Sequence, residues 1–122
     1  MNITSFGQAG IRARDLAASE RFYAGVLNMP LLARESTSGA LSFQVGEFNR
    51  LVVQPKAPDS WPDETDHIAF VIGNNPGALE AVAKRLDEHR VVYERREHAE
   101  FESLCCRDPD GRLVELYYWP SW

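Results

Sequence analysis

Residues 103–118 read SLCCRDPDGRLVELYY, in which two apolar runs flank the tetrapeptide DPDG. Asp, Pro and Gly are the residue types that tight turns favour, so this stretch predicts two antiparallel strands joined by a hairpin turn. Glu115 interrupts the second run, because it stands between Val114 and Leu116. An ionised carboxylate that leaves water costs free energy unless it is paired, hydrogen-bonded or bound to a cation. Glu115 is therefore either exposed to solvent or part of a functional site.

The residues around this hairpin extend it to a unit of one helix and four strands. Strands are predicted at 66–73, 91–97, 102–107 and 112–119, and a helix at 74–91. Asn75 is the expected N-cap of that helix, and Pro76 its first helical residue. The apolar positions of the helix, spaced for one buried face, are Leu79, Val82, Ala83 and Leu86. We also expect Glu80 to pair with Lys84 one turn further on.

The same order of elements occurs in the first half of the chain. Strands are predicted at 4–13, 30–36, 40–46 and 50–55, and a helix at 17–27. Ala18, Phe22 and Val26 recur at helical spacing, and Pro30 is expected to end the helix. Residues 55–66 contain three prolines and four acidic residues without periodicity, so they are predicted to be a linker.

A repeated supersecondary unit implies two modules that pack together. We therefore predict an α+β fold in a single domain, 1–122, built from two βαβββ modules at about 1–58 and 66–122. The eight or so strands are expected to form one open, cupped, mixed sheet with both helices on its convex side.

Composition narrows the possible functions. The 122 residues are 44% hydrophobic and 25% charged, which suits one globular domain. A formal net charge of −5 argues against a nucleic-acid surface, and no apolar stretch is long enough to cross a membrane. The first residues lack the pattern of a signal peptide, so we expect a cytoplasmic protein. Two cysteines, Cys105 and Cys106, form neither a disulfide framework nor a zinc motif.

Strand alternation indicates which side chains face the concave side of the predicted sheet. Ile68 and Phe70 belong to the more apolar face of their strand and should pack beneath the helices, which turns His67 to the opposite, concave side. In the last strand Glu115 and Tyr117 share one face. Composition alone does not decide which face of that strand is the core.

Three segments carry a resemblance to a known family. They are RARDLAASERFYAGVLNMPLL at 12–32, DHIAFVI at 66–72, and 103–118. In this order they resemble the marker segments of the vicinal oxygen chelate superfamily, which includes glyoxalase I, bleomycin-resistance proteins, fosfomycin-resistance thiol transferases and extradiol ring-cleaving dioxygenases. The resemblance implies a divalent metal, which could be zinc, nickel, manganese or iron, held by Gln8, His67 and Glu115, with Glu115 also catalytic.

The sequence departs from individual branches of that family at three places. Gln8 stands where most members have His, so the chain lacks the two-His, one-carboxylate set typical of ferrous extradiol enzymes. Cys105 occupies the position of an active-site tyrosine of those enzymes. The fourth strand offers no carboxylate of the glyoxalase type, and Gln54 is its available side-chain oxygen.

Two classes of function remain open on these residues. One is a glyoxalase-like metal-dependent isomerase, lyase or transferase that acts on a small substrate with vicinal oxygens. The alternative is a metal-free protein that binds a small drug or aromatic molecule, and a further alternative is extradiol ring cleavage. In each case we expect a small-molecule partner in a pocket lined by His98, Cys105 and Tyr117. A homodimer is expected as well, because open sheets leave unpaired edges.

Each candidate residue also has a purely structural interpretation. Glu115 could face solvent or pair with an arginine such as Arg12. His67 could be a strand-end histidine beside the acidic linker, and Gln8 an ordinary polar strand residue. His98, which resembles a pocket-lining histidine of the family, could equally be an exposed loop residue.

Overall fold

The computed structural model describes residues 1, 8–55, 67–99 and 101–118. The chain divides into two compact units, Met1–Trp61 and Pro62–Trp122, and each has the order strand, helix, three strands. The predicted α+β class and the two βαβββ modules are confirmed, with each module forming its own four-stranded sheet. Most of the predicted linker, and residues 4–7 of the first predicted strand, lie outside the described residues.

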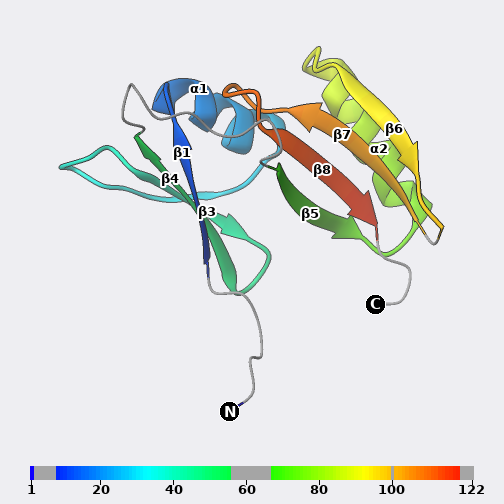
Figure 1. Ribbon diagram of the computed structural model, residues 1–122, viewed down its shortest axis with the longest axis horizontal. Helices are drawn as coiled ribbons and strands as arrows, with labels where there is room; N and C mark the ends of the chain where they lie inside the picture. Colours follow the sequence, from blue (N-terminus) through cyan, green and yellow to red (C-terminus); the bar gives the residue numbers. More distant parts are fainter. Residues whose placement is uncertain (2–7, 56–66, 100, 119–122) are drawn as a thin grey trace. The chain divides into compact units, whose positions relative to one another are not determined.

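Unit 1 contains a mixed sheet and one helical segment (Figure 1). Its elements are β1 (Gln8–Ala13), α1 (Leu16–Glu20), η1 (Arg21–Val26), β2 (Leu31–Arg34), β3 (Leu41–Val45) and β4 (Asn49–Pro55). The strand order is β1-β4-β3-β2, with β1 parallel to β4 and the other pairs antiparallel. The parallel pair joins the first and last strands of the module. The chain leaves β1, passes through the helical segment and returns through β2 and β3 to β4, which pairs with β1.

The core of unit 1 lies between its sheet and its helical segment. The buried apolar side chains are Ala13, Phe22, Tyr23, Ala40, Leu41, Phe43, Leu51 and Val53. The ring of Tyr23 lies 6.0 Å from that of Phe43 and meets the ring of Phe22 edge-on at 5.0 Å. Alternation along β3 and β4 directs Leu41, Phe43 and their partners to this core, so the opposite face of the sheet carries the more polar residues.

The first helix differs from the predicted regular α-helix. After one turn of α-helix it continues as a π-helix, and the N–H of Leu27 donates to the carbonyl of Phe22, five residues back, at 2.9 Å. Within the preceding α-helical turn Ser19 is fully buried while Ala18 is partly exposed, so the buried stripe differs from the predicted one. Asn28 ends the helix in the left-handed conformation, with φ 61°, before Pro30 is reached.

Unit 2 repeats the arrangement with a longer helix. Its elements are β5 (His67–Gly73), α2 (Pro76–Glu88), β6 (Tyr93–Glu97), β7 (Glu102–Arg107) and β8 (Leu113–Tyr118), and the strand order is β5-β8-β7-β6. The predicted cap is confirmed, since the side chain of Asn75 accepts a hydrogen bond from the N–H of Ala78. The predicted Glu80–Lys84 pair is wrong, because Glu80 instead forms an ion pair with Arg95 of β6 at 2.9 Å.

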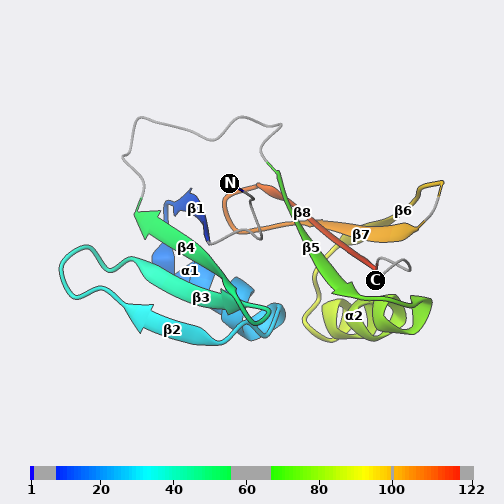
Figure 2. The ribbon, with the colours of Figure 1, turned by 90° about the horizontal axis from the view of Figure 1, so that it is seen from below.

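Burial decides which face of the last strand belongs to the core. Val114 and Leu116 of β8 are buried, as are Leu104 and Cys106, which lie opposite them on β7. Figure 2 shows α2 along one face of this sheet, and its buried residues are Leu79, Ala83 and Leu86. The other face of the sheet therefore carries Glu115.

The turn between β7 and β8 contains a buried ion pair that the sequence did not indicate. The Oδ1 atom of Asp108 accepts hydrogen bonds from the N–H groups of Asp110 and Arg112, each at 2.9 Å. Its Oδ2 atom accepts from the guanidinium of Arg112 at 2.6 Å, and both residues are buried. Gly111 completes the turn with φ 84°, a conformation that glycine adopts without strain.

The helices of the described residues fall short of a membrane span, because none combines the necessary length and hydropathy.

Candidate functional site

The candidate site is the face of the unit 2 sheet that points away from α2, hereafter the Glu115 face. The strand register defines it: Glu115 of β8 lies between Ala69 of β5 and Cys105 of β7. Two pairs further along, Tyr117 lies opposite Ser103. Side chains at paired positions point to the same side of a sheet, so these five residues share the Glu115 face.

His67 belongs to the same face. It is the first residue of β5 and pairs with Leu113, two positions before Glu115. His67 and Glu115 are thus diagonal neighbours on adjacent strands. Such positions lie about 7–8 Å apart at the backbone, a separation at which an imidazole and a carboxylate can reach one ion. The side chain of His67 is exposed.

The carboxylate of Glu115 is held through one of its two oxygens. The hydroxyl of Ser103 donates to Oε2 at 2.9 Å, and Nε2 of His98 lies 3.4 Å from the same atom. The Sγ atom of Cys105 is also near it, at 3.9 Å. Within the described part of the chain, no hydrogen bond or ion pair engages Oε1.

His98 lies in the loop after β6 and is exposed, as its structural interpretation expects, but its ring also contacts Glu115 and Ser103. Its ring stacks on that of Phe101, with centroids 4.3 Å apart and an interplanar angle of 21°. Phe101 in turn lies 5.1 Å from the ring of Tyr117. The side chain of His98 is 35% exposed. The three rings form an aromatic group beside the carboxylate of Glu115.

Ser103 and Phe101 are members of the cluster that sequence reasoning missed. Ser103 is fully buried, and its hydroxyl lies 3.1 Å from Nε2 of His98 as well as 2.9 Å from Glu115. A serine in a strand gives no signal of its own. Counting back from the hairpin turn, however, places Ser103 opposite Tyr117, next to Glu115 on the same face.

The two cysteines point to opposite faces of β7. Cys105 lies on the Glu115 face and borders a hollow of about 220 Å³, which Glu94, Arg96 and Arg107 also line. Burial raises the pKa of the Cys105 thiol, and it raises that of Cys106, in the core, to about 11. Both thiols are therefore mainly protonated near neutral pH, as expected for inert buried cysteines.

Gln8 lies in unit 1, at the start of β1. It pairs with Arg50, whereas its neighbour Ala9 pairs with the core residue Leu51. Gln8 therefore lies on the face of its sheet that points away from the unit 1 core. In the repeat it corresponds to His67, since each begins the strand that runs parallel to the last strand of its own module.

The donors on the Glu115 face fit a divalent cation in their chemistry. An imidazole and a carboxylate share the face, and one carboxylate oxygen is available while the other is held by hydrogen bonds. Among the residues that the structure describes, no three His, Cys, Asp or Glu side chains gather as a metal-binding group. A cation on this face would thus need a third donor of another type.

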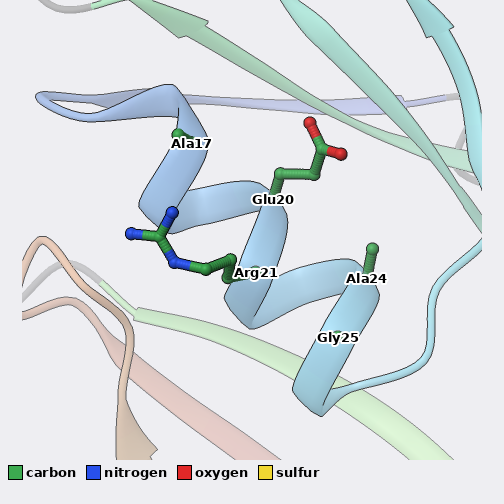
Figure 3. Close-up of a pocket in the computed structure, with 5 residues that line it drawn as sticks. All are labelled: Ala17, Glu20, Arg21, Ala24 and Gly25. Atoms are coloured by element: carbon green, nitrogen blue, oxygen red, sulfur yellow. The ribbon is translucent and has the colours of Figure 1, made fainter.

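A second hollow, of about 460 Å³, lies along the outer side of α1 and η1 (Figure 3). It is lined by Ala17, Glu20, Arg21, Ala24 and Gly25. Glu20 is already paired with Arg34 of β2 at 2.8 Å. A wall of small residues with one exposed arginine offers no group suited to catalysis, so this hollow is not a candidate active site.

Fold and sequence together identify the family. The model of the Glyoxalase/Bleomycin resistance protein/Dioxygenase superfamily matches residues 5–116, so this chain belongs to that superfamily.

Two curated relatives are dioxygenases. The chain is 29% identical over 119 residues to catechol-2,3-dioxygenase of Bacillus subtilis (strain 168), a match that covers 93% of this chain and 41% of the relative. It is 27% identical over 130 residues to biphenyl-2,3-diol 1,2-dioxygenase of Pseudomonas sp. (strain KKS102), covering 99% of this chain and 41% of the relative. The chain therefore spans well under half the length of either enzyme.

Solved structures show the same fold. Lactoylglutathione lyase from Agrobacterium tumefaciens superposes with a TM-score of 0.82 at 18% identity, covering 100% of this chain and 98% of that one. A glyoxylase/bleomycin resistance protein/dioxygenase domain from Frankia sp. EAN1pec gives 0.81 at 20% identity, covering 97% and 99%. At such identities the likeness concerns the fold alone.

Proposed function

We propose that this protein is a metal-dependent enzyme of the glyoxalase type, an isomerase, lyase or transferase that acts on a small substrate with two neighbouring oxygens. The observation that carries the proposal is the register of β5 and β8, which puts His67 and Glu115 at diagonal positions on one face. Gln8 is the third donor in this proposal, and it lies on the corresponding face of its own sheet.

Residues of this chain would bind the metal and transfer a proton. His67, Glu115 and Gln8 would hold the cation, and when bound it would polarise the substrate oxygens. Glu115 is also the candidate for moving a proton, because its carboxylate is in contact with the polar side chains of Ser103 and His98. The partial burial of Glu115 would keep water from competing with the substrate.

The aromatic group beside Glu115 supports a substrate with a flat apolar part. The ring of Phe101 lies 4.3 Å from that of His98 and 5.1 Å from that of Tyr117, and His98 contacts the carboxylate. Flat rings of this kind favour stacking with an aromatic or planar substrate. The predicted pocket residues His98 and Tyr117 would thus act in binding. Cys105 shares their sheet face, but the hollow that its thiol borders is lined by neither His98 nor Tyr117.

Ring cleavage of a catechol-type diol is a second candidate, favoured by the names of the two curated relatives. Two residues weigh against it. Gln8 replaces a histidine of the ferrous site, and the buried thiol of Cys105 cannot donate a hydrogen bond as a phenol does. We therefore rank it below the glyoxalase type.

Metal analysis of protein purified without chelators tests the proposal. We expect up to one equivalent of a divalent metal per chain, and loss of that metal in Glu115→Gln and in His67→Ala. His89→Ala is the matched control, because His89 is an exposed histidine at the C-cap of α2, away from the Glu115 face. This variant should keep the full metal content.

A parent protein that neither retains nor takes up metal would overturn the proposal. The metal-free binding protein would then be the better account, because the carboxylate of Glu115 already has protein partners in Ser103 and His98. Isothermal titration with catechol and with a planar cationic dye would identify such binding directly.

A further inference from the structure

We propose that Ser103 is a positioning residue that holds Oε2 of Glu115 and so directs Oε1 toward the bound metal. This inference rests on the proposed metal-dependent function. It concerns a residue that no sequence pattern singles out and that lies wholly inside unit 2, where the contacts are described. The observation that supports it is the buried hydroxyl of Ser103, which lies between the carboxylate of Glu115 and the imidazole of His98.

The direction of the hydrogen bonds follows from the chemistry of the three groups. An ionised carboxylate only accepts hydrogen bonds, so the hydroxyl proton of Ser103 must go to Oε2 of Glu115, at 2.9 Å. The hydroxyl oxygen can then accept a proton from Nε2 of His98, at 3.1 Å. The chain of donors runs from His98 through Ser103 to Glu115, and it requires the His98 tautomer that is protonated at Nε2.

His98 is in turn held in place by its surroundings. Its ring stacks on Phe101 at 4.3 Å, which restricts rotation of the imidazole. The same Nε2 atom lies 3.4 Å from Oε2 of Glu115, so the imidazole reinforces the hold on that oxygen. Ser103 and His98, with the more distant thiol of Cys105, thus converge on one carboxylate oxygen. No described residue holds the other oxygen.

Other roles for Ser103 are excluded by its burial and by its partner. A serine nucleophile must present its oxygen to the substrate, but Ser103 is 0% exposed. Its proton is directed to a carboxylate, whereas activation would require a base that removes the proton from an oxygen aimed at the substrate. The hydroxyl of Ser103 acts through Glu115, as residues around metal ligands commonly do.

The expected consequence is a loss of metal affinity without a matching loss of fold. In Ser103→Ala the carboxylate of Glu115 can rotate. Metal binding must then fix its orientation, which weakens the binding. Removal of such a supporting hydrogen bond typically weakens metal binding by about 10-fold to 100-fold. Ser103→Thr keeps a hydroxyl in a strand position that suits a β-branched residue, so it should restore most of the affinity.

The test combines two measurements on the full chain. Isothermal titration with Zn²⁺ compares the parent with Ser103→Ala, Ser103→Thr and the control Ser42→Ala, in which a serine of β3 in unit 1 is changed. Nitrogen-15 NMR of the His98 ring in metal-free protein reports its tautomer, and we expect Nε2 to be protonated in the parent. Thermal unfolding of every variant shows whether it is folded before titration.

The outcomes separate this inference from the proposed function. A tenfold or greater rise in Kd for Ser103→Ala, with Ser42→Ala unchanged, supports the role of Ser103. Equal Zn²⁺ affinity in folded Ser103→Ala and parent, or a His98 ring protonated at Nδ1 alone, overturns the role while the metal function stands. A parent that does not bind Zn²⁺, Ni²⁺, Mn²⁺ or Fe²⁺ overturns both. If Ser103→Ala does not fold, the tautomer and the titration of Ser103→Thr still decide.

Discussion

The carboxylates of Asp108 and Glu115, both in unit 2, are held in different ways, which indicates a structural role for one and a functional role for the other. Both oxygens of Asp108 accept hydrogen bonds, from two backbone N–H groups and from the guanidinium of Arg112. Glu115 is held through Oε2 alone by side chains. A carboxylate that is fully satisfied stabilises a turn, whereas one with an available oxygen on a sheet face can bind a ligand.

The buried ion pair of the turn gives a first prediction. Asp108→Ala should lower the free energy of unfolding by about 3–5 kcal/mol, because it leaves the buried charge of Arg112 without this carboxylate. Urea denaturation followed by circular dichroism measures the change. The double variant Asp108→Ala, Arg112→Met removes both charges and should regain part of the loss. A single variant within about 1 kcal/mol of the parent would contradict the importance of the pair.

The thiol of Cys106 gives a second prediction, on pH dependence. Burial raises its pKa from 9.0 in the unfolded chain to about 11 in the folded one. Well below pH 9 the thiol is protonated in both states and contributes no pH dependence. Between pH 9 and 11 it ionises in the unfolded chain first, so its contribution to stability falls as pH rises, by about 1.4 kcal/mol per unit at most.

The control for this effect is Cys106→Ala, which lacks the thiol. Its free energy of unfolding at neutral pH will be lower because of the cavity, so the comparison uses only the slope between pH 9 and 11. A slope as steep in the variant as in the parent would show that Cys106 does not cause the alkaline loss of stability.

At the residue scale, the sequence indicated that Glu115 belongs to the candidate site, but it gave no such indication for Ser103. A charge between Val114 and Leu116 is visible because it breaks a local pattern. Ser103 matters only through its position opposite Tyr117, and strand register depends on pairing between segments that the sequence does not show directly. His98 was indicated by family resemblance, but its contacts depend on the loop that stacks it against Phe101.

At the scale of elements, the two helices were predictable to different degrees. For α2 the cap, the proline and the apolar spacing all agree, and the helix begins where expected, at Pro76. For the first helix the spacing indicated a regular α-helix, yet the segment from Arg21 becomes a π-helix. Packing of Phe22 and Tyr23 against the sheet accompanies that change, and such tertiary effects override local propensity.

The cap of α2 gives a third prediction. The side chain of Asn75 accepts a hydrogen bond from the N–H of Ala78 at 3.3 Å, and the same N–H also donates to the backbone carbonyl of Asn75 at 3.2 Å. Asn75→Ala should lower the free energy of unfolding by about 1 kcal/mol, and Asn75→Asp should largely preserve it. Asn75→Asp is the matched control, because an aspartate side chain can accept the same hydrogen bond. Asn74 does not suit this purpose, since its side chain accepts a hydrogen bond from the amide of Asn75 at 3.1 Å. Equal stability of Asn75→Ala and Asn75→Asp would argue against the cap.

At the scale of the whole molecule, the repeat is regular in its fold but not in its chemistry. His67 and Glu115 in unit 2 correspond by register to Gln8 and Val52 in unit 1. The second module therefore has the carboxylate that its counterpart lacks. Such a division is consistent with at most one site of the proposed kind per chain. The backbone repeat was predictable from the sequence order of elements, while the placement of His67 and Glu115 on one face of the unit 2 sheet depends on the register of the strands.

The last prediction concerns assembly. Each of the two sheets ends in edge strands, and all four residues of β2 are exposed, with Leu31 at 37% and Leu32 at 46%. Unpaired backbone groups beside exposed leucines favour association with a second copy, since monomers commonly protect such edges. We therefore predict a homodimer, whose mass by light scattering after size exclusion is twice that of one chain. Leu32→Lys should increase the monomer fraction if β2 lies in the contact. A single-chain mass at about 50 µM, in protein shown by circular dichroism to be folded, would contradict the dimer.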